Sequence, residues 1–79
     1  MRVSVRLHGV LRRYHPGPNP HKPFDVAVSQ HSMILDLVPV LGLPAAMVWA
    51  SSLNSEAVEL DHPLSDGDRV SLFAPAAGG

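Results

Sequence analysis

The residues of this chain best suited to chemistry are its last two, Gly78 and Gly79. A terminal pair of glycines has no side chain that could block entry into a narrow tunnel, and glycine reaches backbone conformations that are closed to other residues. The second glycine also carries the free carboxylate. We therefore expect the chemistry of this chain to take place at the carboxylate of Gly79.

Other side chains that could do chemistry do not form a recognisable site. The five histidines show no His-x₃-His ligand spacing, and although His15 and His21 share a loop, scattered solvated histidines explain the pattern better. The aspartates between residues 61 and 68 lack the full calcium-loop pattern that ends in glutamate. No serine comes with a histidine and an acid in a visible arrangement. We expect no metal site and no serine hydrolase.

Length and composition restrict the class of protein. A chain of 79 residues forms one domain, and domains of this size bury only about 60% of their unfolded surface. Hydrophobic residues make up 46% and charged residues 16%, as in globular proteins. The net charge of −1 argues against a nucleic-acid partner, and the absence of an 18-residue apolar stretch or a signal peptide argues against a membrane partner. Without cysteine the chain has no disulfide, and a cytoplasmic location is the simplest expectation.

Two strands are predicted in the N-terminal third. Residues Arg2–His8 alternate between apolar and polar side chains, and Phe24–Val28 alternate again. Between them, residues 15–23 contain four prolines, which predicts an irregular surface loop. The two strands should form a hairpin with an unusually long connection.

One helix is predicted in the middle of the chain. Ser32 offers a hydroxyl that can cap the helix Met33–Leu41, and a glycine follows it. Pro39 conflicts with this reading, because proline inside a helix removes a hydrogen bond and costs roughly 3 kcal/mol. We expect a short or kinked helix. Leu35 and Val40 would lie on its outer face, where they could contact another protein.

Three further strands are predicted in the C-terminal half. Residues Ala45–Leu53 read as a strand that places Trp49 in the core, followed by a turn at Asn54–Ser55. A short return strand is predicted at Ala57–Leu60 and the last strand at Arg69–Ala74. The order of two strands, one helix and three strands is typical of an α+β domain.

The last strand carries an aromatic residue on its polar side. Val70 and Leu72 share one face, whereas Arg69 and Phe73 share the other. Large aromatic side chains on such a face are typical of binding anchors, although a neighbouring loop could also cover the ring. Pro75 cannot continue a central strand, so the chain should leave the sheet there.

The last third of the sequence resembles a known family. It resembles the ThiS/MoaD family of ubiquitin-like sulfur carriers. Four segments carry this resemblance: Leu53–Glu56, Asp61–Leu64, Leu64–Val70 and Pro75–Gly79. From Asp61 onward the chain looks most like the small subunits of molybdopterin synthases. The resemblance implies the β-grasp fold, with a mixed sheet and one main helix packed on it. It implies a domain at residues 1–74 and a flexible tail at 75–79.

The resemblance also implies a chemistry. In this family a ubiquitin-activating-type adenylyltransferase uses ATP to adenylate the terminal carboxylate, here that of Gly79. Sulfur from a persulfide donor then forms a thiocarboxylate, which a large synthase subunit or another sulfur-acceptor enzyme consumes. The carrier binds no permanent cofactor and is not an enzyme by itself. Partner-binding residues would be Gly78, Pro75, Phe73 and Arg69.

Three departures mark a divergent member of that family. The loop 15–23 is long, Pro39 stands at a position that is usually polar, and Ser55 replaces the glycine of the usual Asn-Gly turn. The pathway could therefore be molybdopterin or tungstopterin synthesis, thiamine thiazole synthesis or another sulfur transfer. Two alternatives are a ubiquitin-like modifier joined to proteins through Gly79 and a β-grasp interaction module whose Gly-Gly is incidental.

Overall fold

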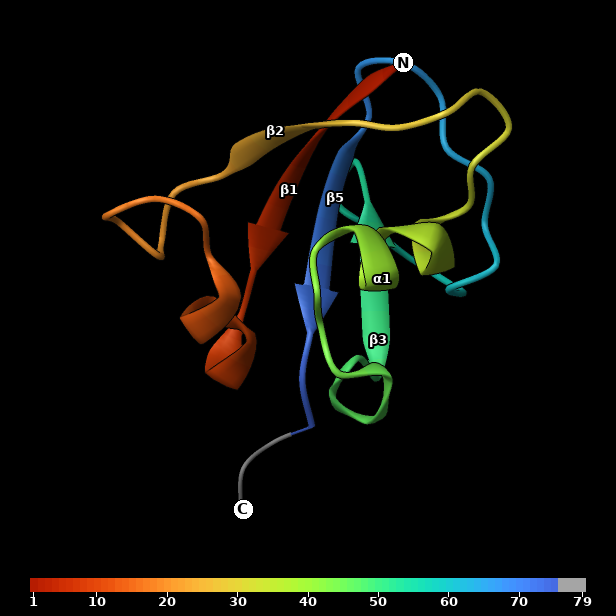
Figure 1. Cartoon of the computed structure of the whole chain (residues 1–79). Helices are drawn as coiled ribbons and strands as arrows, with labels where there is room; N and C mark the ends of the chain where they lie inside the picture. The colour runs from red at the N-terminus through yellow and green to blue at the C-terminus, as the bar shows by residue number, and fades with distance from the viewer. Residues whose placement is uncertain (76–79) are drawn as a thin grey trace.

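The computed structural model of the chain describes residues 1–75, which form a five-stranded sheet with short helical segments against it (Figure 1). The strands are β1 (Arg2–Leu7), β2 (Phe24–Ala27), β3 (Ala50–Leu53), β4 (Glu56–Val58) and β5 (Arg69–Phe73). The helical segments within residues 1–75 are η1 (Gly9–Tyr14), η2 (Ile34–Asp36), α1 (Leu37–Val40) and η3 (Ala45–Met47), of which only α1 is an α-helix.

The sheet is mixed and its order is β2-β1-β5-β3-β4. The first and last strands lie side by side and run parallel, with Val5 opposite Val70. The other pairs are antiparallel: β1 with β2, β3 with β4 and β3 with β5. The predicted α+β order and the predicted hairpin of the first two strands are therefore confirmed.

The core lies between the sheet and the helical layer. Alternate residues of the two central strands point into it, so Val5 and Leu72 are completely buried and Leu7 nearly so. From the helical side, Ile34 and Leu37 are also completely buried. The alternation predicted for the first and last strands is confirmed, and it leaves the opposite face of the sheet free for polar residues.

The predicted helix is shorter and less regular than a single α-helix over Met33–Leu41. It begins as the 3₁₀ segment η2, and α1 has only four residues, because Pro39 has no N–H to donate. Ser32 does not cap it: its hydroxyl donates to the Ser29 carbonyl, and the Asp36 carboxylate instead accepts from the Met33 N–H at 2.8 Å. No helical segment within residues 1–75 has the length and apolarity needed to cross a membrane.

The helix ends as predicted, at Gly42. This residue has a φ of 69°, and the N–H of Leu43 donates to the Val38 carbonyl at 2.9 Å. Glycine adopts this left-handed conformation without a steric penalty, and the backbone bond satisfies a carbonyl that the helix end leaves free. Leu35 and Val40 are exposed, as expected for the outer face.

The strand predicted at Ala45–Leu53 is wrong in its first half. Residues Ala45–Met47 form η3, and the strand begins only at Ala50. Pro44 directly precedes η3 and has an extended backbone conformation. Its carbonyl accepts a hydrogen bond from the Met47 N–H at 3.0 Å. Within β3 the predicted facing holds, since Ser51 is buried, but Trp49 precedes the strand and is 68% exposed, whereas Val48 is buried.

The turn predicted at Asn54–Ser55 is confirmed. Both residues have positive φ, 51° and 76°, which is the conformation of a tight hairpin turn. The return strand is Glu56–Val58 rather than Ala57–Leu60.

Ser51 on β3 is buried, and its hydroxyl donates to the Val58 carbonyl at 2.9 Å, which satisfies a polar group inside the core.

The proline-rich connection is irregular as predicted, but one histidine organises it. His15 accepts from the Gly17 N–H through Nδ1, and its Nε2 lies 2.8 Å from the Lys22 carbonyl. The ring also packs edge-on against Phe24, at a centroid distance of 4.8 Å. His15 therefore holds the two ends of the loop together.

Candidate functional site

The candidate site starts where the chain leaves the sheet. β5 ends at Phe73, and the chain continues beyond the end of the sheet that also carries η1 and η3 (Figure 1). Pro75 is the last described residue, so the predicted reactive residues Gly78 and Gly79 lie outside the described part of the chain. The described residues therefore form the surface from which the tail departs.

Phe73 stacks on a histidine from the neighbouring strand. The rings of His8 and Phe73 lie 4.4 Å apart between centroids and are inclined by 15°. The His8 N–H donates to the Leu72 carbonyl at 3.1 Å, which extends the pairing of β1 with β5 by one residue. One side of Phe73 is thus covered by His8, while the residue as a whole is only partly buried. Its role as a partner anchor stays a prediction.

The environment of His8 favours the neutral imidazole. Burial lowers the pKa of His8 below its ordinary value of 6.5, and the nearby positive charges of Arg12 and Arg6 lower it further. Its Nε2 is buried and has no hydrogen-bond partner within residues 1–75. The stacked pair therefore presents an uncharged aromatic surface near neutral pH.

Trp49 is a candidate site residue that the sequence reasoning placed in the core. Its backbone N–H donates to the Phe73 carbonyl at 3.0 Å, so it lies beside the point where the tail begins. Its indole Nε1 donates to the Ala46 carbonyl at 2.9 Å. Because the only polar atom of the side chain is satisfied, the 68% of Trp49 that is exposed is mainly apolar ring surface. Pro44 was the signal that could have revealed the irregular start of this strand.

The open face of the sheet brings together polar residues from three strands. Arg69 lies opposite Ser4 on β1, and Arg6 lies opposite Ser71 on β5. Phe73 follows Ser71 by two residues and shares its face. The structure therefore places two predicted partner-binding residues, Arg69 and Phe73, on one surface. Pro75 follows at its end.

This surface offers contacts rather than catalytic groups. It presents two guanidinium groups and several serine hydroxyls, with the ring of Phe73 nearer the tail. Among residues 1–75, no three histidine, aspartate or glutamate side chains gather in a way that could hold a metal ion. Such a set of residues is suited to binding another protein.

Comparison with known proteins defines the family. The family model described as Mut7-C ubiquitin matches residues 1–76, almost the whole chain. The chain belongs to this family. The match agrees with the mixed five-stranded sheet and its short helix, and the ubiquitin-like β-grasp fold expected from the sequence is confirmed.

Individual relatives agree with this assignment. A segment of 29 residues is 48% identical to the molybdopterin synthase sulfur carrier subunit of Escherichia coli, covering 37% of this chain and 36% of that protein. The structure of SAMP1, a small archaeal modifier protein of Haloferax volcanii, covers all of both chains with a TM-score of 0.70 and 22% identity. A chain in the complex of subunits 1 and 2 of the molybdopterin-converting factor from Helicobacter pylori also matches over the full length of both chains, with a TM-score of 0.60 and 26% identity. The resemblance to sulfur carriers of the molybdopterin branch is confirmed.

Proposed function

We propose that this chain is a sulfur carrier whose terminal Gly79 is adenylated and converted to a thiocarboxylate. The observation that carries the proposal is the 48% identity of its 29-residue segment to the E. coli sulfur carrier subunit. The terminal Gly-Gly follows Pro75 after two alanines, a short distance behind the last strand, which supports the proposal. Molybdopterin or tungstopterin synthesis is the pathway that the relatives favour, and a thiamine-type sulfur transfer is the second candidate.

The proposed chemistry needs no catalytic group from this chain. A carboxylate oxygen of Gly79 attacks the α-phosphorus of ATP, and pyrophosphate leaves. The terminal sulfur of a donor persulfide then attacks the acyl carbon, and AMP leaves with the bonding electron pair. A thiol attacks the resulting acyl disulfide, which yields a mixed disulfide and the thiocarboxylate. The activating enzyme, the persulfide donor and the thiol are all partners, so the chain acts as a protein cosubstrate.

The described residues would supply the docking surface for these partners. Phe73 and Trp49 lie where the tail departs, and Arg69 lies on the adjoining polar face. Aromatic and arginine side chains are the residue types most enriched among strong interface contacts. The H. pylori structure is a complex of subunits 1 and 2 of a molybdopterin-converting factor, which supports a large synthase subunit as one partner here.

The substitution Gly78→Val tests the passage of the tail into the activating enzyme. The branched side chain should block entry, so ATP–pyrophosphate exchange catalysed by that enzyme should fall to background. Ala27→Val, at an exposed position of β2, is the matched control and should exchange normally. Both variants should unfold at the same denaturant concentration as the wild-type chain. Normal exchange by Gly78→Val would refute the proposed role of the terminal glycines.

Intact mass separates the proposal from its two alternatives. A carrier should gain about 16 Da at its C-terminus when sulfur replaces oxygen. A ubiquitin-like modifier should instead appear in isopeptide-linked ladders, and deletion of Gly78 and Gly79 should abolish them. An interaction module should show neither change and should keep its activity after the same deletion.

A further inference from the structure

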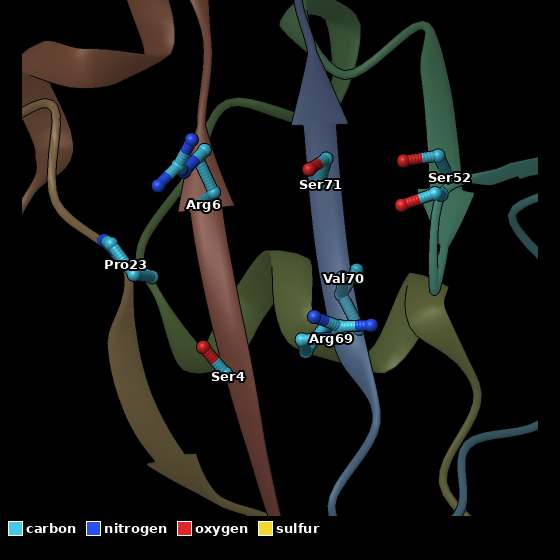
Figure 2. A pocket seen from close by; sticks show the side chains of 8 residues that line it. Ser4, Arg6, Pro23, Ser52, Arg69, Val70 and Ser71 are labelled. Atoms are coloured by element: carbon cyan, nitrogen blue, oxygen red, sulfur yellow. The ribbon is translucent and has the colours of Figure 1, made fainter.

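A shallow polar pocket lies on the open face of the sheet, and the helical layer lies behind the sheet in this view (Figure 2). Its volume is about 360 Å³. Side chains from β1, β5 and β3 line it, together with residues of two loops: Ser4, Arg6, Pro23, Ser52, Ser55, Arg69, Val70 and Ser71. The pocket is therefore large enough to receive several side chains of another molecule.

The strand register concentrates positive charge in this pocket. Ser4 lies opposite Arg69 and Arg6 lies opposite Ser71, so the two arginines stand diagonally across adjacent strands. Strand spacings place their Cα atoms roughly 8 Å apart. Both side chains are exposed, and Figure 2 shows both guanidinium groups among the lining side chains.

Negative charge does not line the same pocket. The lining residues include no aspartate and no glutamate, although the chain as a whole carries a net charge of −1. The nearest acidic residue in the register is Asp25 on β2, which lies opposite Ser4 but does not line the pocket. The electrostatic attraction for an anion is therefore local to this face rather than a property of the whole surface.

We propose that this pocket binds the carboxylates of an acidic segment on the protein that receives the tail. Guanidinium groups match carboxylates in two-pronged hydrogen bonds, and the serine hydroxyls add donors beside them. Ser71 lies on the same face as Phe73, two residues before it on β5, so the pocket lies next to the aromatic ring at the start of the tail. The proposal rests on the proposed function for the identity of that receiving protein.

Two features favour a protein over a nucleic acid as the partner. A nucleic acid is held by a track of cations along many phosphates, whereas only two arginines line this pocket. The other polar residues of the lining are serines, whose hydroxyls can donate hydrogen bonds to a few carboxylates. The adjoining aromatic residues favour a protein surface that has both apolar and acidic parts.

The test uses the full-length ¹⁵N-labelled chain and a synthetic peptide of alternating glutamate and alanine at low ionic strength. Amide shifts should concentrate at Ser4, Arg6 and Ser71, and a peptide with glutamine in place of glutamate should not cause them. The double variant R6Q/R69Q should raise the Kd about tenfold, the expected scale for two exposed charge pairs. The matched double variant R2Q/R13Q removes the same net charge outside the pocket and should bind as the wild type does.

Other results would overturn the inference. The inference would fail if the glutamine peptide bound as tightly as the glutamate peptide, or if R6Q/R69Q bound the glutamate peptide as tightly as the wild type does. It would also fail if a ten-nucleotide RNA or inorganic phosphate bound more tightly than the glutamate peptide at the same ionic strength. The experiment does not depend on tail chemistry. Failure of pyrophosphate exchange with normal peptide binding would therefore overturn the proposed function alone, and the reverse result would overturn the pocket alone.

Discussion

Removing the Trp49 side chain should weaken partner binding far more than a typical surface substitution. A tryptophan side chain buries up to about 250 Å², and 68% of Trp49 is still exposed in the free chain. About 170 Å² is thus available to a partner, worth at most about 4 kcal/mol at about 25 cal/mol per Å². Association recovers only part of this, so we expect Trp49→Ala to cost about 2 kcal/mol, or about 30-fold in affinity.

The assay is ATP–pyrophosphate exchange by the activating enzyme at varied concentrations of the chain. Trp49→Ala should raise KM about 30-fold and leave kcat nearly unchanged, because docking is lost equally from ground and transition states. Leu35→Ala removes another exposed apolar side chain, on the outer face of the helical layer, and should leave both constants unchanged. An unaltered KM for Trp49→Ala would refute the placement of the docking surface at this end of the sheet.

Two further predictions concern the stability of the chain. Ser55→Gly should raise the free energy of unfolding by about 0.5 kcal/mol in urea titrations, because Ser55 has a φ of 76° that glycine adopts without strain; a loss of stability would contradict the turn geometry. His8 has a lowered pKa, so the unfolded chain takes up a proton near pH 6.5 while the folded chain resists it. The contribution of neutral His8 to the free energy of unfolding is therefore fully present above pH 6.5 and should be lost as the pH falls through the folded pKa. The free energy of unfolding of His8→Phe should fall less than that of the wild type over the same pH range.

The strands could be predicted from the sequence because their packing is simple. Val3, Val5 and Leu7 alternate with polar residues, and so do Val70 and Leu72, which face the same core. A strand that is buried on one face and open on the other must show this period of two. The sequence alone therefore carries enough information to say which face of each central strand is buried.

The helical layer could not be predicted as well, because local and long-range effects compete there. Pro39 limits α1 to four residues, yet Leu37 and Val38 remain buried against the sheet. Pro44 similarly sets the 3₁₀ turn before β3, which moves Trp49 out of the core and Val48 into it. The alternation of β3 begins only at Ala50, so it does not govern Trp49, and the apolar residues before Ala50 hid this boundary.

The candidate site could also be predicted only in part from the sequence. Phe73 and Arg69 could be placed on one face from the alternation of the last strand alone. The partners that complete their surroundings, His8 and Arg6, come from the other end of the sequence, because β1 pairs with β5 in parallel. Contacts between the two ends of a chain require the register of the strands, which single-sequence patterns do not contain.

Sulfur transfer to Gly79 is tested most directly by the intact mass of the chain purified from its native cell under non-reducing conditions. We expect a species heavier than the unmodified chain by about 16 Da, with the added mass in the C-terminal peptide that ends at Gly79. The added mass should disappear after the activating enzyme is deleted. A chain that carries only its unmodified mass while that enzyme is active would contradict the account.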